Sequence, residues 1–484
     1  MHRKNQLKGR VLTTTVMLVA AVAIVPSALA ASAVKEGAKC TGKEVGRTRA
    51  GAGGVSLICT KSGSKTTWQK LPAPVTTVAG APATTPVAKP TYTDPGITDT
   101  EITFGQSWPL TGPAGAVYKP LNDSMNGYIK WVNDNGGVKM GDGKTRKIVV
   151  KTLDDGFDPA KGLENARKLV EGDKVFSMFF NAGTPVNTVI SGYTEPLGVP
   201  NVLISSSSEK WGDLKKYPNT IGFQALGITE GAIWAKWLTE NMKGAKVAML
   251  QDNSDFGRST KAIFESTLAD LNSTVKLVAT QTYETTDPTV DSQITNLAAS
   301  GANVFMNIAT LPTASKAIKR IAETNWRPTQ IVSLVSNGVG SALAPAGYEA
   351  ADGVLTTFFL KDPADPKWNG DPWVINWRSV MAKNAPSVNQ KDILNLFACV
   401  MVEALVDNLQ QMKTPTRAGL MDSVRHMNFE IGGLLPGVKA ITSPTDPYPI
   451  ESLALGQFNS STKQYVLFNN TIVNGEGKTP KPSS

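Results

Sequence analysis

Alternating strand-like and helix-like segments constrain this chain more than any other feature of its sequence. From Ile97 onward, short apolar runs typical of buried strands alternate with runs whose apolar residues recur at helical spacing. We expect strands at residues 102–106, 147–152, 175–180, 199–204, 246–251, 275–279, 304–308 and 331–334, and helices at 122–135, 159–171, 189–195 and 230–242. This alternation predicts an α/β fold with mostly parallel sheets, and a break near residues 222–227 divides it into two doubly wound lobes.

The first 30 residues have the pattern of a secretory signal peptide. A basic segment at residues 3–10 precedes an apolar segment at residues 11–25, and Ala28-Leu29-Ala30 provides a cleavage signal. We therefore expect a secreted or extracytoplasmic protein, in the periplasm or associated with the cell envelope. Removal of the segment lowers the net charge from +9 to +5. The remaining Lys and Arg are spread along the chain, which indicates a solvated surface and no nucleic-acid partner.

A small glycine-rich segment and a linker precede the α/β pattern. Residues 31–70 combine glycines with short Val, Leu and Ile runs, which predicts a small β-rich module. A module of this size needs a covalent staple, and we predict a disulfide between Cys40 and Cys59. Residues 71–96 are rich in Pro, Thr and Ala and are expected to form an extended linker. Residues 471–484 are expected to form a flexible tail.

Small polar residues follow the predicted strands, at the places where parallel sheets bind ligands. They include Ala182, Gly183 and Thr184, then Ser206, Ser207 and Ser208, and farther along Thr310, Ser336 and Asn337. Trp108 and Phe256 add aromatic side chains to the same loops. This composition favours hydrogen-bonded capture of a small molecule.

The junction at residues 175–185 is the most informative of these loops. An apolar strand leads to Gly183, which allows a turn, to Thr184, which can cap a helix, and to Pro185, which suits the first helical turn. A helix that begins here offers free backbone N–H groups and a hydroxyl to a carboxylate or phosphate. An ordinary helix cap without a ligand is the alternative explanation for the same residues.

The sequence is poor in residue types that catalyse reactions. Beyond the signal peptide the only histidine is His426, in a helical surface pattern, so a Ser-His-Asp hydrolase is a remote alternative. The sequence contains no Cys or His cluster for zinc and no glycine-rich phosphate loop, so we predict neither a metal nor a cofactor. Asp154 and Asp155 are expected to serve a turn and a helix cap, and Cys399 to be a buried structural thiol. We therefore expect a protein that is not an enzyme.

An ordered set of short motifs resembles a known family. In chain order they are Thr-Gly-Pro at 111–113, Asn-Asp-Asn-Gly-Gly-Val at 133–138, Asp-Asp-Gly-Phe-Asp-Pro at 154–159, Gly-Val-Pro-Asn-Val-Leu-Ile-Ser-Ser at 198–206, Asp-Phe-Gly at 255–257, Thr-Asp-Pro-Thr-Val-Asp-Ser-Gln at 286–293 and Leu-Leu-Pro-Gly at 434–437. Together they resemble the type I periplasmic binding proteins of branched-chain amino acid ABC transporters, over residues 97–468.

The resemblance implies two lobes joined by a hinge, which close over a small ligand and present it to an ABC permease. We assign residues 97–224 with 358–430 to lobe 1, and residues 225–357 with 431–470 to lobe 2. The implied partners are an amino-acid-like, amide or carboxylate solute and the membrane subunits of the permease, and the protein is expected to be a monomer. The same fold serves in ligand-sensing receptors, which remains the alternative function.

The resemblance also implies roles for individual residues. Tyr118, with Trp108 nearby, would cover the ligand from lobe 1, and Phe256 would close over it from lobe 2. The positions that would hold a ligand carboxylate are Gly183, Thr184, Ser206, Ser207 and Ser208.

Residues 336–338 depart from the family pattern. Amino-acid binders have an acidic residue in this loop, which pairs with the ligand ammonium, whereas this chain has Ser-Asn-Gly. A buried ammonium without a partner is costly. An amino-acid ligand would therefore need Asp252, Asp255 or Glu209 as the substitute, and aromatic or aliphatic carboxylates, amides and small peptides remain open.

Overall fold

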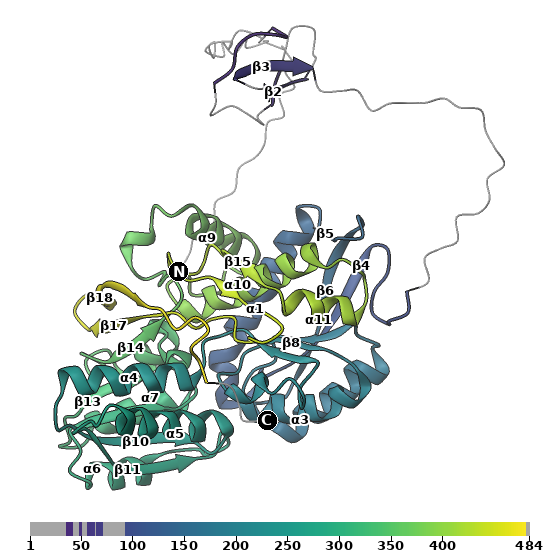
Figure 1. Ribbon diagram of the computed structural model, residues 1–484. Helices are drawn as coiled ribbons and strands as arrows, with labels where there is room; N and C mark the ends of the chain where they lie inside the picture. Colours follow the sequence, from purple (N-terminus) through teal and green to yellow (C-terminus); the bar gives the residue numbers. More distant parts are fainter. Residues whose placement is uncertain (1–34, 42–47, 51–55, 63, 71–91, 481–484) are drawn as a thin grey trace, which may run out of the picture. The chain divides into compact units, whose positions relative to one another are not determined.

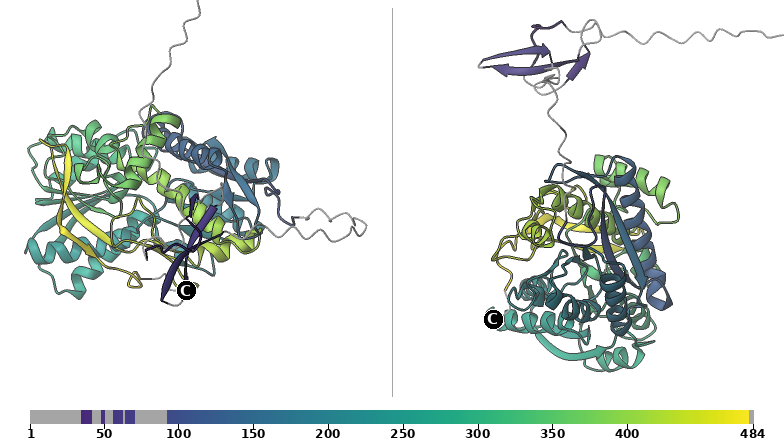
Figure 2. Two further views of the ribbon diagram at one scale, coloured as in Figure 1. Left: turned by 90° about the horizontal axis from the view of Figure 1, so that it is seen from above. Right: turned by 90° about the vertical axis from the view of Figure 1, so that its right-hand side faces the viewer.

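A computed structural model describes residues 35–41, 48–50, 56–62, 64–70 and 92–480 (Figures 1 and 2). The predicted signal peptide, most of the predicted linker and the last four residues lie outside this part of the chain. Contacts within the chain divide it into two units, residues 1–89 and 90–484, which are described separately.

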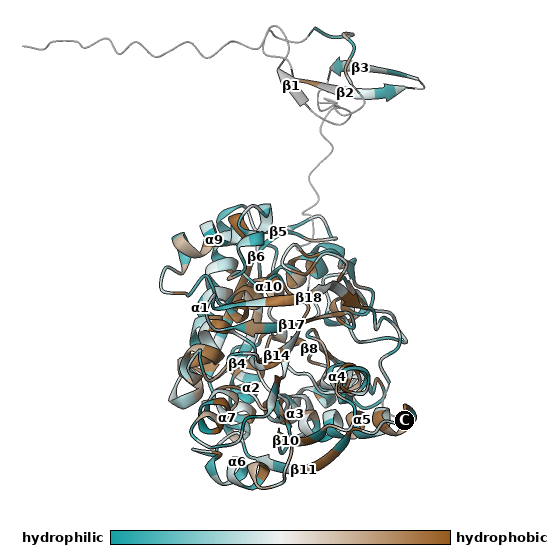
Figure 3. Cartoon of the chain, turned by 90° about the vertical axis from the view of Figure 1, so that its left-hand side faces the viewer, coloured by the Kyte–Doolittle hydropathy of each residue, from teal (hydrophilic) through white to brown (hydrophobic). Residues whose placement is uncertain are grey.

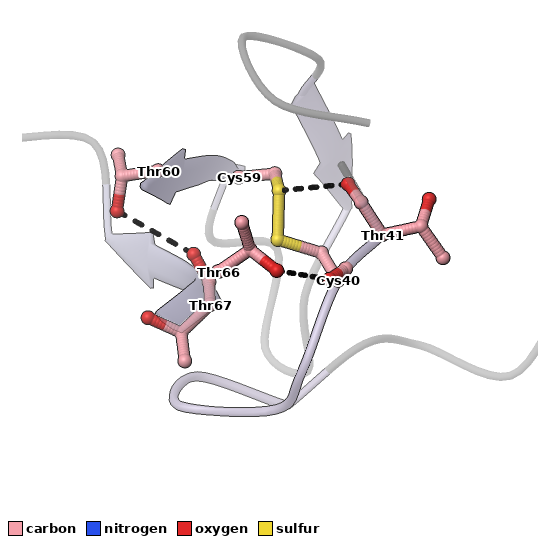
Figure 4. The surroundings of a disulfide bond; sticks show 6 residues. All are labelled: Cys40, Thr41, Cys59, Thr60, Thr66 and Thr67. Carbon is pink, nitrogen blue, oxygen red and sulfur yellow. Dashed lines mark hydrogen bonds between the residues drawn. A yellow bond between two sulfur atoms is a disulfide. The ribbon is translucent and has the colours of Figure 1, made fainter. Parts of the chain in front are cut away.

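The N-terminal unit contains a three-stranded antiparallel sheet in the order β1-β2-β3. Its strands are β1 (Thr48–Ala50), β2 (Ser56–Ser62) and β3 (Lys65–Lys70). Cys40 and Cys59 form a disulfide, and the buried Leu57 and Trp68 complete a small core. Thr66 Oγ1 donates a hydrogen bond to the carbonyl of Cys40, beside the disulfide (Figure 4). These contacts confirm the predicted disulfide and the β-rich character of the module.

A six-stranded sheet forms the centre of lobe 1, in the order β5-β6-β4-β7-β8-β9. β5 is antiparallel to β6 and the other neighbours are parallel, which confirms the predicted architecture. The strands are β4 (Glu101–Trp108), β5 (Val138–Lys139), β6 (Thr145–Asp154), β7 (Ser177–Phe179), β8 (Asn201–Ile204) and β9 (Thr220–Gly222).

Helices cover both faces of this sheet (Figure 1). Gln106 of β4 accepts a hydrogen bond from Asn122 of α1, and the next residue, Ser107, accepts one from Asn165 of α2. Because successive strand residues point to opposite faces, α1 and α2 lie on opposite sides of the sheet. The helices and helical turns here are α1 (Gly112–Asp134), α2 (Pro159–Arg167), η3 (Lys168–Gly172), α3 (Thr184–Thr194), η4 (Glu195–Leu197), η5 (Glu209–Gly212), η8 (Pro366–Trp368), α9 (Pro372–Asn384), α10 (Ile393–Gln411) and α11 (Arg417–Val424).

The first helix is longer than its sequence pattern predicts. We expected a helix from residue 122, but α1 begins at Gly112 and contains Pro120. Val117 and Leu121 are buried on either side of the proline. Packing of this apolar face outweighs the tendency of an internal proline to end a helix.

A seven-stranded sheet forms the centre of lobe 2, in the order β11-β10-β12-β13-β14-β17-β18. The strands from β11 to β14 are parallel to one another. β17 pairs antiparallel with β14, and β18 pairs antiparallel with β17 at the edge of the sheet. The strands are β10 (Lys246–Asp252), β11 (Lys276–Tyr283), β12 (Val304–Ile308), β13 (Thr329–Val332), β14 (Leu355–Phe358), β17 (Leu453–Asn459) and β18 (Gln464–Val473). A separate two-stranded sheet joins β15 (Asn428–Phe429) to β16 (Ala440–Ile441).

Apolar residues on both faces of this second sheet are buried beneath helices. Val247 and Met249 of β10 pack in one cluster with residues of α4 and α5, whereas Ala248 and Leu250 pack in another with α6 and α7. Brown, hydrophobic stretches are visible on β11, β17 and β18 (Figure 3). The helices and helical turns of this lobe are α4 (Gly227–Asn241), α5 (Asp255–Asp270), α6 (Asp291–Ala298), α7 (Thr313–Ala322), η6 (Leu334–Ser336), η7 (Val339–Leu343) and α8 (Ala344–Ala346).

The chain crosses between lobe 1 and lobe 2 three times. The passages lie at residues 223–226, between β9 and α4, at residues 359–371, between β14 and α9, and at residues 442–452, between β16 and β17. α9 and α10, which follow the second passage, pack against α1 of lobe 1. The residue limits given above for the two lobes stay a prediction.

α10 is long and apolar enough to cross a membrane by composition, but here it is a core helix. It packs against α1, and most of its side chains are buried. Trp377 Nε1 donates a hydrogen bond to Cys399 Sγ over 3.2 Å, and burial raises the pKa of the thiol. Cys399 is therefore the buried structural thiol that its apolar surroundings predict.

Candidate ligand-binding site

A cavity lies where loops at the carboxyl ends of strands from both sheets meet. Its volume is about 60 Å³, which is room for several water molecules. Eight of the residues singled out from the sequence line it: Tyr118, Gly183, Thr184, Ser206, Ser207, Phe256, Thr310 and Asn337. Residues from both lobes therefore contribute to one potential binding site.

The junction between β7 and α3 forms part of the lobe 1 wall. Gly183 has a φ of 82°, and the Phe157 ring lies 2.6 Å from where a Cβ would stand, so only glycine fits. α3 begins at Thr184, with Gly183 as its N-cap and Pro185 in its first turn. The prediction that Thr184 caps this helix is wrong. Its hydroxyl instead lies 2.7 Å from Ser206 Oγ, because the β8 loop packs against the junction.

Hydroxyl groups from the loop after β8 line the same wall. Trp211 Nε1 donates to Ser206 Oγ over 2.8 Å, and Gln224 Nε2 donates to Ser207 Oγ over 2.6 Å. Each serine therefore accepts one bond and keeps a proton that it can donate. Backbone N–H groups in the first turn of α3 add donors, because they have no acceptor within the helix. This wall suits a carboxylate or carbonyl oxygen.

Aromatic rings line another part of the cavity. The rings of Tyr118 and Phe157 stack with their centroids 5.3 Å apart. Trp108 does not line the cavity: it is fully buried, and its Nε1 donates to the backbone carbonyl of Tyr118 over 2.7 Å. Phe256, in the first turn of α5, contributes its ring from lobe 2.

Most of the apolar lining was not anticipated from the sequence. These residues come from α1, the loops after β6 and β13, the end of β14, the second passage between lobes and the start of α10, so no local motif marks them as a group. They are Leu121, Phe157, Leu334, Val335, Phe358, Phe359, Leu360, Ile393, Leu394 and Phe397. They make the cavity mainly apolar, with polar groups confined to a few positions.

Asp252 is the only carboxylate among the lining residues. Its Oδ1 accepts hydrogen bonds from Ser254 Oγ over 2.7 Å and from the backbone N–H of Gly257 over 3.1 Å. Burial raises its pKa to about 6, although these bonds favour the ionised form. Of the three substitutes considered for the missing acidic residue, Asp255 and Glu209 do not line the cavity.

Three further residues singled out from the sequence lie behind the lining. Ala182 is buried beneath the junction. Ser208 caps η5 by accepting a bond from the backbone N–H of Lys210, and Ser336 Oγ donates to the carbonyl of Ala309 over 2.7 Å. Their hydrogen bonds hold the loops in place, so they support the lining rather than form it.

Asp154 and Asp155 hold turns, as predicted, but neither caps the next helix: the N-cap of α2 is Asp158, which accepts a bond from the backbone N–H of Ala160. Asp154 Oδ1 accepts a bond from the backbone N–H of Leu110 over 2.8 Å, and Asp155 accepts bonds from Ser107 Oγ and the N–H of Phe157. Burial raises the pKa of Asp155 to about 6. Both side chains therefore stabilise the loops around the first strands.

Other titratable groups lie outside the cavity. Among the described residues, one group of carboxylates has ligand oxygens within 4.8 Å of one another: Asp446, Glu451 and Glu476. Both oxygens of Glu451 already accept backbone N–H groups, which accounts for its position without an ion. His426 is half exposed at the end of α11, where its Nδ1 lies 2.7 Å from the carbonyl of Asp422.

Sequence comparisons agree with this architecture. A sequence profile described as periplasmic binding protein matches residues 101–463. The Leu/Ile/Val-binding protein homolog 1 of Brucella abortus (strain 2308) is 25% identical over 277 residues, which cover 56% of this chain and 70% of the relative. The Leu/Ile/Val-binding protein BraC3 of Rhizobium johnstonii is 27% identical over 170 residues, or 35% of this chain and 44% of the relative.

Solved structures share the fold at lower sequence identity. A substrate-binding periplasmic protein from Ralstonia solanacearum superimposes with a TM-score of 0.67 at 17% identity, covering 76% of this chain and 100% of its own. A branched-chain amino acid ABC transporter protein from Thermus thermophilus with bound valine gives 0.64 at 17% identity, covering 76% and 95%. With the matched profile over most of the chain and two α/β lobes around one cavity, the protein belongs to the type I periplasmic binding proteins.

Proposed function

We propose that this chain is the extracytoplasmic solute-binding protein of an ABC importer. It captures a small solute by closure of the two lobes and presents it to the membrane permease, as a monomer and without catalysing a reaction. The observation that carries the proposal is the shared cavity, which Thr184 and Ser206 line from lobe 1 and Asp252 and Phe256 from lobe 2.

The lining supports a solute that is apolar at one end and carries a carboxylate or carbonyl group at the other. The hydroxyls of Thr184, Ser206 and Ser207 would donate hydrogen bonds to the oxygen atoms of the solute, and the phenylalanine rings would contact its apolar part. Asp252 would pair with an ammonium group if the ligand has one. An apolar amino acid would contact the hydroxyls, the phenylalanine rings and Asp252, whereas an aromatic or aliphatic carboxylate would contact only the hydroxyls and the rings.

A thermal-shift screen of the chain without residues 1–30 tests the proposal. The panel contains valine, isoleucine, benzoate and a fatty acid, which are named with other structures of this fold, together with amides and short peptides. A ligand that binds only the folded state raises the melting temperature. We expect a shift from one of these classes, abolished when Thr184 and Ser206 are both replaced by Ala. A shift that survives this double substitution would place binding elsewhere and contradict the proposal.

A further inference from the structure

The N-terminal module accounts for the net positive charge that remains after removal of residues 1–30. Residues 31–70 contain eight Lys and Arg and two Glu, a net charge of +6. Residues 97–484 contain 36 Lys and Arg and 37 Asp and Glu, a net charge of −1. Lys and Arg occur in both parts of the chain, but only in residues 97–484 do Asp and Glu balance them, so the two parts differ in net charge.

Four lysines in the described part of the module point into solvent. Lys35, Lys39, Lys61 and Lys65 are all exposed, and they form no ion pair among the described residues. We call them the module lysines. Exposed ammonium groups without a partner attract anions over distances of about 10 Å at moderate salt concentration.

Two of the module lysines share one face of the small sheet. Lys39 lies opposite Thr67 in the adjoining bridge, and Lys65 lies two residues before Thr67 on β3. Because alternate residues of a strand point to the same side, Lys39 and Lys65 project together. The paired residues Cys59 and Trp68 point to the opposite side, where the core lies.

The polar face offers charge but no pocket for bases or apolar groups. The large apolar side chains that the structure describes in this unit, Leu57 and Trp68, are buried, so neither can stack on a nucleic-acid base or insert into a bilayer. An exposed, lysine-bearing sheet of this kind complements a flat layer of negative charge. Anionic headgroups of a lipid bilayer form such a layer, and basic residues are attracted to it.

We propose that the module lysines bind the module to the surface of an anionic lipid bilayer. The binding is electrostatic and superficial, without insertion of side chains into the hydrocarbon. This binding does not involve the ligand cavity, so a test of it neither supports nor contradicts the proposed transport function. Its consequence is a raised local concentration of the binding protein next to the membrane.

Co-sedimentation with lipid vesicles tests the proposal, using the chain without residues 1–30. We expect binding to vesicles of phosphatidylcholine mixed with phosphatidylglycerol, little binding to phosphatidylcholine alone, and loss of binding as salt is raised to about 0.5 M. Replacing all four module lysines by Gln should weaken binding by about twenty-fivefold or more. This estimate takes about fivefold for each lysine and counts only the two on one face.

A matched variant and a competitor complete the experiment. Lys161, Lys243, Lys276 and Lys413 are exposed on the two lobes, and replacing these four by Gln removes the same charge while leaving vesicle binding unchanged. An intact Cys40–Cys59 disulfide, measured by mass after thiol labelling, shows that the module variant is folded. Equal binding by the two variants, or equal binding to neutral and anionic vesicles, overturns the proposal. Binding to polyphosphate without binding to vesicles also overturns it, in favour of a soluble polyanion.

Discussion

Thr184 and Ser206 determine the polarity of the lobe 1 wall. Their hydroxyl oxygens lie 2.7 Å apart, and Ser206 Oγ also accepts a bond from the indole N–H of Trp211. Because Trp211 occupies a lone pair, the serine proton remains available for Thr184 or for a ligand oxygen. Both residues are buried, so a hydrogen bond formed here is shielded from competing water.

Replacing Thr184 and Ser206 together by Ala is expected to weaken ligand binding by about a hundredfold or more. Hydrogen bonds to a charged group contribute roughly 1.5–3 kcal/mol each, and two are lost. Calorimetric titration with the ligand found in the screen measures the change. A double variant with Ser266→Ala and Thr295→Ala removes two hydroxyls from exposed helix positions outside the cavity lining, so it is the matched control and should bind like the unaltered chain.

Asp252→Asn distinguishes an amino-acid ligand from a simple carboxylate. Because burial raises the pKa of Asp252 to about 6, the side chain is ionised at about pH 7.5 and neutral at about pH 4.5. We expect apolar amino acids to bind the Asn variant at least about tenfold more weakly, and the unaltered chain to lose affinity for them below about pH 6. A ligand without an ammonium should bind the variant equally well. Amino-acid affinity that is insensitive to both changes would exclude Asp252 as the ammonium partner.

At the scale of elements, Glu230 connects α4 to β14 and to the loop after β13 in lobe 2. Its Oε1 accepts bonds from the N–H of Leu334 over 2.9 Å and from Thr357 Oγ1 over 2.6 Å, and its Oε2 accepts one from Ser333 Oγ. Leu334 lines the cavity, so these bonds hold the back of the site in place. Burial raises the pKa of Glu230 to about 7, even though the hydrogen bonds favour the ionised form.

Glu230→Gln is expected to remove part of the pH dependence of folding stability. The pKa of Glu230 rises from an ordinary 4.5 to about 7 on folding, so the folded chain holds the proton more tightly. This stabilisation is complete below about pH 4.5 and is lost as the pH rises through 7, a change on the order of 3 kcal/mol. Urea denaturation at several pH values should show a flatter profile for the variant. Glu240→Gln, on an exposed position of the same helix, should keep the original slope.

The bounds of an element could be predicted closely where its own residues determine them, but not where contacts with distant parts of the chain do. β12 has the bounds that its apolar run predicts, because a strand buried on both faces is apolar throughout. The start of α1 and the role of Thr184 were mispredicted. In both cases tertiary contacts, the packing of Val117 and the bond to Ser206, outweigh the local signal.

At the scale of the whole molecule, the two lobes also touch outside the cavity lining. Lys210 of η5 forms an ion pair with Asp255 of α5, with 2.6 Å between Nζ and Oδ2. Burial alone would raise the pKa of Asp255, but Lys210 and Arg258 outweigh it and hold the pKa below its ordinary value. Tyr448, in the third passage, donates to the carbonyl of Glu209 over 2.8 Å. The ion pair joins the two lobes directly, so it favours the closed arrangement, and the Tyr448 bond ties the third passage to lobe 1.

Lys210→Met is expected to make the bound ligand dissociate about fivefold faster. A partly buried ion pair contributes on the order of 1 kcal/mol, and its loss destabilises the closed state while leaving the ligand contacts intact. Stopped-flow measurements separate the two rate constants, and the association rate constant should change little. Arg258→Met removes another cation from Asp255 within α5 itself and is the matched control. Equal dissociation rates for the two variants would show that the contact between lobes does not hold the ligand in.

The polar part of the candidate site could be anticipated from the sequence, whereas most of the apolar part could not. Serine and threonine donors directly follow strands, and parallel strands bring their carboxyl ends together. Phe359 and Phe397 reach the cavity from the second passage and from α10, far along the chain from those donors. Asp252 ends β10 and Asp255 begins α5, three residues later, and only the turn between them decides which carboxylate lines the cavity.

Gln224 gives the hinge a direct part in holding the ligand. It lies in the first passage between the lobes, lines the cavity, and bonds to the hydroxyls of both Ser205 and Ser207. Opening the lobes requires backbone rotation in this passage, which moves the amide that orients those hydroxyls. In the proposed transport cycle, opening of the lobes would therefore lower the affinity for the solute directly, and release of the solute and separation of the lobes would be one event.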